Sequence, residues 1–181
     1  MTSKDDAKSL IAPEELRMRL SFDDDKLVAE CDVDRYRASG PGGQHRNKVS
    51  SAVRLRHKPS GLVALATESR LQNENKVRAL SRLRSAIALV ARAPLPESVV
   101  WPEGVDMTRG KLRVNEKNPA IHDVIAIVLD ALFEAQGRLS DAAKALGLTS
   151  SNVTRFLHDH PKAWREANRI REQAGLPPLK S

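Results

Sequence analysis

The chain contains few sulfur-bearing and aromatic residues: Cys31 is its one cysteine, and aromatic residues make up 3% of 181. A single cysteine excludes a disulfide within the chain, which is typical of proteins from reducing compartments. With so few rings, the core has to consist mainly of Leu, Ile, Val and Ala. The sequence also lacks an apolar run long enough to cross a bilayer, and a secretory signal near its first residues. We therefore expect a cytoplasmic protein without membrane contact.

Acidic residues are scarce in the middle of the chain. Residues 35–92 contain 13 Lys and Arg in total but only two acidic residues, Glu68 and Glu74, which gives a net charge of +11. The whole chain carries +7. Residues 1–34 are acidic, and residues 93–181 are nearly neutral. So dense a basic segment indicates a polyphosphate partner, because contacts between cations and phosphates release condensed counterions. A solubilising surface is the weaker alternative.

A glycine-rich motif, Ser-Gly-Pro-Gly-Gly-Gln, occupies residues 39–44 within this basic segment. Glycines reach backbone dihedrals that are closed to residues with a Cβ, and the proline fixes one φ angle among them. Such a loop can bring a backbone amide against a crowded anionic target. On the tripeptide alone, a flexible turn between strands is an equally good interpretation. Polar and basic side chains follow the motif directly: His45, Arg46, Asn47 and Lys48.

Taken with the residues around it, the motif resembles the Gly-Gly-Gln domain of class I peptide release factors. The resemblance extends over about residues 33–92, and an ordered series of this length is specific. Arg46 and Leu71 depart from the usual pattern of the family, but neither replaces a group with an obvious chemical role. The matching parts after the loop are Ser51-Ala52-Val53-Arg54-Leu55, His57-Lys58-Pro59-Ser60-Gly61 and Arg70-x-Gln72-x-x-Asn75-Lys76.

The resemblance implies hydrolysis of the ester between a nascent peptide and its tRNA, inside the ribosome. In this family's mechanism the backbone amide of Gln44 donates to the oxyanion, and Gly42 and Gly43 let the loop present it, supported by Gly40 and Pro41. One such donor is worth about 3 kcal/mol in other acyl-transfer sites. The Gln44 side chain, an amide and not a base, would position the water. The implied partners are ribosomal RNA of the peptidyl-transferase centre, peptidyl-tRNA and a glutamine methyltransferase acting on Gln44.

The resemblance and the charge together predict RNA contacts around the loop. No cofactor or metal is expected, since His158, Asp159 and His160 are spaced too closely to share a helix face. The predicted RNA-binding residues are His45, Arg46, Asn47, Lys48, Arg54, Arg56, His57, Lys58, Arg70, Gln72, Asn75 and Lys76.

The hydrophobic pattern predicts an α+β fold for this segment. Alternation favours strands at 32–37, 52–58 and 62–67 in a three-stranded antiparallel sheet. A helix over 70–92, begun by a capping box at Ser69 and Gln72, should cover one face of it. Two short helices, at 13–20 and 23–30, come first; Ser21 is the expected N-cap of the second, and these acidic turns are expected to pack beside the basic domain. The expected apolar positions of the long helix are Leu71, Val77, Leu80, Leu83, Ile87 and Val90.

The order of these parts predicts an acidic helical segment at 1–30, a Gly-Gly-Gln catalytic domain at 31–92, a proline-rich linker at 93–118 and an all-α module at 119–181. The module resembles a helix-turn-helix, in which Ala143 permits close crossing and Gly147 makes the turn. Leu148, Val153 and Phe156 are expected to be buried between its helices. The cations of the module proposed to contact nucleic acid are Arg155, Lys162, Arg165, Arg169 and Arg171.

Two functions remain open at this stage. Codon-reading release factors are considerably longer than this chain, so the resemblance favours a codon-independent member that rescues stalled ribosomes. Rescue factors of this kind commonly end in a Lys- and Arg-rich tail, whereas residues 172–181 contain only Lys180 as a base. The alternative is a DNA-binding regulator whose second helix offers base-reading side chains. For the module alone, a packing or dimerisation bundle is a further alternative. The candidate base readers are Ser150, Ser151, Asn152, Thr154 and Arg155.

Overall fold

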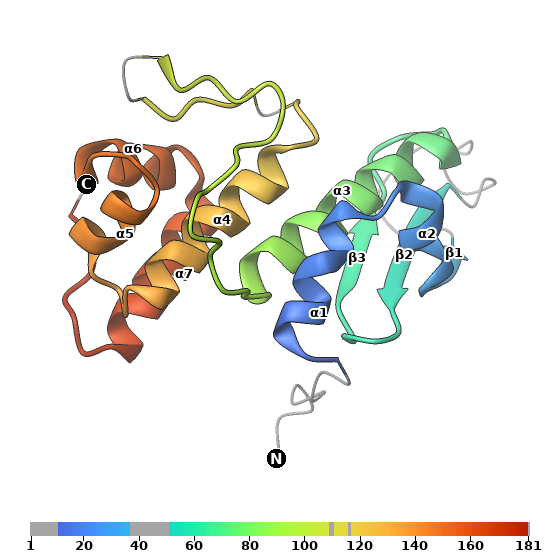
Figure 1. Ribbon diagram of the computed structural model, residues 1–181. Helices are drawn as coiled ribbons and strands as arrows, with labels where there is room; N and C mark the ends of the chain where they lie inside the picture. Colours follow the sequence, from blue (N-terminus) through green and yellow to red (C-terminus); the bar gives the residue numbers. More distant parts are fainter. Residues whose placement is uncertain (1–10, 37–50, 109–110, 116, 181) are drawn as a thin grey trace. The chain divides into compact units, whose positions relative to one another are not determined.

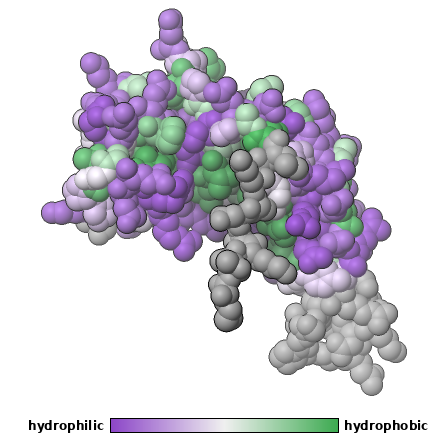
Figure 2. All heavy atoms as spheres, turned by 90° about the horizontal axis from the view of Figure 1, so that it is seen from below, coloured by the Kyte–Doolittle hydropathy of each residue, from purple (hydrophilic) through white to green (hydrophobic). Residues whose placement is uncertain are grey.

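The computed structural model describes residues 11–36, 51–108, 111–115 and 117–180. The chain divides into two compact units, Met1–Ile87 and Ala88–Ser181, which are called unit 1 and unit 2 below (Figure 1). Within the described residues, every helix is too short or too polar to span a membrane. On the face that Figure 2 shows, hydrophobic side chains form small groups among hydrophilic ones.

Unit 1 contains the predicted three-stranded antiparallel sheet, in the order β1-β2-β3. Tyr36 lies opposite Ala52 in the β1–β2 pair, and Val53 lies opposite Ala66 in the β2–β3 pair. One long helix, α3, follows the sheet. The α+β prediction for this part of the chain is therefore confirmed. The elements are β1 (Cys31–Tyr36), β2 (Ala52–His57), β3 (Val63–Ala66) and α3 (Gln72–Val90).

The core of unit 1 lies between the sheet and its helices. Val53, Leu55 and His57 alternate along β2 on the buried side, while the arginines between them face solvent. From α3, the side chains of Ala79, Leu80, Leu83 and Ile87 are buried. Three of the expected apolar positions of the long helix face solvent instead: Leu71, just before α3, and Val77 are each 61% exposed, and Val90 is 50% exposed.

A short helical segment precedes the sheet. Its second helix is capped by Asp23, whose carboxylate accepts from the Lys26 amide at 2.7 Å. The predicted N-cap, Ser21, instead closes the preceding turn by donating to the Met18 carbonyl at 2.8 Å. The correction has a simple cause: the chain makes one more tight turn before α2 begins. The elements are α1 (Pro13–Met18), the 3₁₀ turn η1 (Arg19–Ser21) and α2 (Asp24–Ala29).

Arg84 of α3 holds this acidic segment. Its guanidinium donates to the Leu20 carbonyl at 2.9 Å, to the Phe22 carbonyl at 2.7 Å and to the Asp24 carboxylate at 2.9 Å. The Arg84 side chain is 14% exposed. The acidic turns therefore pack on the basic helix, as expected from their charge.

Unit 2 is built from four helices within its described residues. Its core is formed by α4, whose Val124, Val128, Leu129 and Leu132 are fully buried. Gly147, at φ +66°, makes the turn between α5 and α6, a conformation that favours glycine. Val153 and Phe156 are buried as predicted, whereas Leu148 stays partly exposed. The helices are α4 (Ile121–Glu134), α5 (Leu139–Ala145), α6 (Ser150–Asp159) and α7 (Pro161–Gln173).

The described residues between α3 and α4 belong to unit 2 and contain no α-helix. The amide of Ala93 donates to the Asp130 carboxylate at 3.2 Å, and the amide of Leu95 donates to the Glu134 carboxylate at 3.1 Å. Further along, residues 106 and 113 pair in an isolated antiparallel bridge. The segment predicted as a linker thus packs along α4.

Candidate functional site

The Gly-Gly-Gln motif belongs to the connection between β1 and β2. Residues 37–50 lie outside the described part of the chain, so the roles of Gly40 through Lys48 stay predictions. Their attachment points are described. Because Tyr36 and Ala52 face each other across the β1–β2 pair, the connection leaves β1 and enters β2 at the same end of the two strands. This end of the strand pair is called the loop edge below. Everything that fixes this edge therefore supports the proposed catalytic loop.

Asn75 of α3 is the side chain that ties this edge to the helix. It is fully buried. Its Nδ2 donates to the Ser51 carbonyl at 2.7 Å and to the Ser69 carbonyl at 2.9 Å, and its Oδ1 accepts from the Ser69 amide at 3.0 Å. The structure corrects the prediction of an RNA contact here, because the buried amide group is used inside the domain. It also shows that Asn75 accepts from the Ser69 amide at the helix start.

His57 is the second predicted RNA contact that the structure corrects. The ring is fully buried, with Nε2 at 2.9 Å from a Glu30 carboxylate oxygen and Nδ1 at 2.6 Å from the Ser60 hydroxyl. A carboxylate can only accept, so Nε2 donates to it and the imidazole holds the turn to the sheet. The alternation that placed Val53 and Leu55 inside also places His57 inside, a signal that its basic neighbours obscured.

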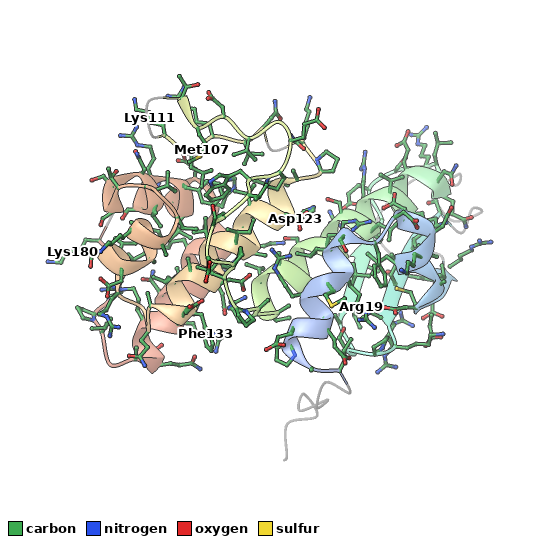
Figure 3. The ribbon with its side chains drawn as sticks, in the orientation of Figure 1. Arg19, Met107, Lys111, Asp123, Phe133 and Lys180 are labelled. Carbon is green, nitrogen blue, oxygen red and sulfur yellow. The ribbon has the colours of Figure 1, made fainter. Side chains whose placement is uncertain are left out.

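Glu30 joins three parts of unit 1. Besides His57, it accepts from Arg19, whose Nε lies at 3.2 Å from the carboxylate; Figure 3 shows Arg19 at the end of α1. Burial on its own raises the pKa of Glu30, but hydrogen bonds from His57 and Arg19 outweigh it, and the pKa is lowered. Glu30 therefore remains charged in the folded protein near neutral pH.

Ser60, His57 and Glu30 have the composition of a hydrolase triad. However, Ser60 is only 8% exposed and also accepts from the Leu62 amide at 3.3 Å. A nucleophile must reach its substrate, and this hydroxyl is enclosed in the turn that it stabilises. The trio is therefore a structural connection between α2 and the β2–β3 turn.

A small depression lies at the base of the proposed loop. It brings the predicted Gln72 and Lys76 of α3 together with Arg35 of β1, which sequence reasoning missed. The register explains Arg35: it lies opposite Val53, on the side of the sheet that faces α3. Two cations and an amide beside the loop base can hold a phosphate group. The depression is lined by Val28, Val33, Arg35, Val53, Gln72, Asn73 and Lys76.

The opposite face of the sheet carries the predicted Arg54 and Arg56, both exposed. Arg54 donates to the Asp34 carboxylate at 2.7 and 3.0 Å, and both partners are about half exposed. An exposed pair of this kind is worth at most about 1 kcal/mol, so a phosphate can displace the carboxylate. Lys58 is exposed at the far end of β2, about 20 Å from the loop edge at the usual rise per residue. Arg70 is exposed just before α3.

The predicted cations of unit 2 divide into two groups. Arg169 donates to Glu166 at 2.6 and 2.8 Å, and Glu166 also accepts from the buried Arg92 at 2.6 Å. Arg171 donates to backbone carbonyls, among them that of Pro177 at 2.8 Å. These two arginines make contacts inside unit 2, and their role as nucleic-acid contacts stays a prediction. The other predicted cations of the module, Arg155, Lys162 and Arg165, are exposed.

Residues 25–99 match the RF-1 domain family. Over 67 residues the chain is 48% identical to peptide chain release factor 2 of Acidithiobacillus ferrooxidans, and over 85 residues it is 42% identical to peptide chain release factor 1 of Gluconobacter oxydans. Over 59 residues it is 54% identical to peptide chain release factor 1 of Leptothrix cholodnii. The matched parts cover 37%, 47% and 33% of this chain, in that order.

The matched segment spans only 18%, 23% and 16% of these relatives, respectively. The range matched by the family, residues 25–99, includes the sheet, all of α3 and the connection that carries the Gly-Gly-Gln motif. The predicted resemblance to class I release factors is confirmed for this segment. The match to the RF-1 domain family therefore falls on the sheet of unit 1 and on the helix that follows it.

Proposed function

We propose, from the RF-1 domain at residues 25–99, that the protein hydrolyses the ester of peptidyl-tRNA on the ribosome and so releases the nascent peptide. The observation that carries this proposal is the match to release factors over the segment that contains the Gly-Gly-Gln motif. The basic charge of residues 35–92 supports an RNA partner.

In the proposed reaction, water attacks the ester carbonyl and a tetrahedral oxyanion forms. The backbone amide of Gln44 donates to this oxygen, because Gly42 and Gly43 permit the backbone to approach so closely. The Gln44 side chain is an amide and cannot accept the proton of the attacking water. Its role is therefore to position the water and to exclude larger nucleophiles. Ribosomal RNA supplies the rest of the site. Gly40 and Pro41 shape the loop.

The scaffold supports the proposed reaction by holding the loop edge in place. Asn75 links Ser51 to α3, and the depression with Arg35, Gln72 and Lys76 lies beside the same edge. We assign RNA contacts to Lys76 and Gln72 there, and to the exposed Arg54, Arg56, Lys58 and Arg70. Positioning of this kind, with no acid–base exchange by the protein, accounts for large rate effects in other enzymes.

Two finer proposals follow from the resemblance. The first is that release does not depend on a stop codon, as in ribosome rescue. The second is that Gln44 is the substrate of a glutamine methyltransferase. Mass spectrometry of the protein from its own cells checks the second, and an unmodified Gln44 contradicts it.

Release from ribosomes that carry peptidyl-tRNA tests the function and its codon dependence together. Three complexes are compared: a stop codon, a sense codon, or no codon in the decoding site. We expect the fastest release from the complex without a codon. Release confined to the stop codon contradicts the rescue proposal but keeps the reaction. Absence of release from all three contradicts both.

A further inference from the structure

We propose that one face of α6 binds RNA with unpaired bases, in a contact separate from the RF-1 domain. This face, called the α6 face, consists of Ser150, Ser151, Thr154, Arg155 and His158. The inference concerns unit 2 and does not depend on the release reaction.

The fold leaves this face open. Val153, Phe156 and Leu157 turn the other side of α6 into the core of unit 2, where α5 and α7 pack against the helix (Figure 1). Ser151, Arg155 and His158 are exposed at the spacing that places side chains on one helix face. All five residues of the α6 face line one shallow, open depression.

The α6 face is preformed. Thr149 caps the helix by accepting from the Asn152 amide at 3.3 Å, and the Thr154 hydroxyl donates to the Ser150 carbonyl at 2.9 Å. The Thr154 oxygen thereby keeps an acceptor site for a ribose 2′-hydroxyl. A partner that binds such a face does not have to order it first, which favours affinity.

The charge of the α6 face suits an anion. It contains no carboxylate, and within the described residues Arg155 has no ion-pair partner. Arg138 of the same unit differs in this respect, because its Nε forms an ion pair of 2.7 Å with the Asp141 carboxylate. The acid nearest to the α6 face in sequence is Asp159, 4.0 Å from Nδ1 of His158.

Aromatic rings continue the α6 face onto α7. The His158 ring stands edge-on to that of Trp164, with 5.6 Å between their centroids. Trp164 is partly exposed and is followed by the exposed Arg165. Aromatic rings and arginine guanidinium groups are typical surfaces on which unstacked bases stack.

Two observations favour RNA with unpaired bases over duplex DNA. Stacking platforms engage bases that a duplex keeps paired. Strong DNA sites also neutralise about six to ten phosphates, whereas the α6 face and the start of α7 offer few exposed cations, namely Arg155, Lys162 and Arg165. Ser150, Ser151 and Thr154 supply hydroxyl groups that can read ribose.

The test measures binding of the full chain to a fluorescein-labelled RNA hairpin with an unpaired pyrimidine loop, by anisotropy at several salt concentrations. We expect the double variant Arg155→Ala, His158→Ala to bind about tenfold more weakly, because a stacked base is worth about 1–3 kcal/mol. Its salt slope should fall by about 0.7 for the lost cation. Arg138→Ala, which removes the same charge from unit 2, should bind like the wild type.

Several results overturn the proposal. One is equal affinity of the double variant and the wild type for the hairpin. Another is that a DNA hairpin of the same sequence, or a fully paired RNA, binds as tightly as the RNA hairpin and loses affinity in the same double variant. If the double variant loses affinity for intact ribosomes but not for the hairpin, the α6 face contacts a protein instead. Ser151→Glu, which places a negative charge on the same face, gives a second variant should the double variant not fold.

Discussion

The side-chain amide of Asn75 donates a hydrogen bond of 2.7 Å to the backbone carbonyl of Ser51, 24 residues earlier in the chain. Ser51 is the last residue before β2, where the connection with the Gly-Gly-Gln motif rejoins the sheet. A buried helix residue therefore fixes one end of the proposed catalytic loop.

Asn75→Ala should lower both stability and peptide release. It leaves the Ser51 and Ser69 carbonyls and the Ser69 amide without this partner, which costs about 1–3 kcal/mol for each of these groups that water does not reach. Release should fall about tenfold even at a temperature where the variant is fully folded, because the loop edge is no longer fixed. Single-turnover release and urea unfolding measure the two effects. Ser81→Ala, at an exposed position further along α3, is the matched control; undiminished release by folded Asn75→Ala contradicts the positioning role.

Substitution of His57 should affect the stability of the protein, whereas substitution of Arg56 should affect its binding to RNA. His57→Gln removes ring contacts to Glu30 and Ser60, so the free energy of unfolding should fall by about 1–3 kcal/mol while ribosome affinity is kept. Arg56→Gln, one residue earlier on the exposed face, should leave stability unchanged and weaken salt-dependent ribosome binding. Thermal unfolding and sedimentation with ribosomes measure the pair, and the opposite pattern contradicts the assignment.

Glu30 should make stability depend on pH in the acid range. Its pKa in the folded protein is lowered below the ordinary 4.5, despite the opposing effect of burial. The unfolded chain therefore binds the proton more readily, and the stabilisation is present above that value and lost as pH falls through the lowered pKa. Between about pH 6 and about pH 3, the wild type should lose more stability than Glu30→Gln. Urea unfolding at each pH checks this, and parallel curves for the two proteins contradict it.

Cys31 should be unreactive in the folded protein. Burial, aided by the charges of Glu30 and Asp32, raises the pKa of its thiol to about 11. Its Sγ also lies 3.2 Å from the Leu27 carbonyl. At about pH 8 roughly a thousandth of the thiol is then ionised, and the thiolate is the reactive form. A chromogenic disulfide reagent should label Cys31 only after denaturant is added; prompt labelling of the native protein contradicts the raised pKa.

Local patterns in the sequence were sufficient to predict the sheet and the long helix. The alternation of Val53 and Leu55 with arginines determines which face of β2 is buried, and that register extends to neighbouring strands. The same pattern failed at helix ends. Three consecutive aspartates begin near Ser21, and the extra turn before the cap Asp23 receives hydrogen bonds from the distant Arg84.

Partners that are distant in sequence explain what could not be predicted. Asn75 is interpreted as an RNA contact until its hydrogen bond to Ser51 is seen, and no local pattern indicates that Glu166 accepts from both Arg169 and Arg92. In α3, alanine and asparagine take inward positions while Val77 faces solvent, because the direction of the helix determines which side is buried as a whole. Such choices depend on tertiary packing, which outweighs the hydrophobicity of single residues.

The most direct test compares wild type and Gly43→Ala in release of peptide from ribosome-bound peptidyl-tRNA, with ribosome binding measured in parallel. The account predicts release by the wild type and nearly complete loss in Gly43→Ala with binding retained, because an added Cβ restricts the backbone that presents the Gln44 amide. Gln44→Ala should lose only part of the rate. Wild-type release by Gly43→Ala, or intact peptidyl-tRNA in the presence of the wild type, contradicts the central claim.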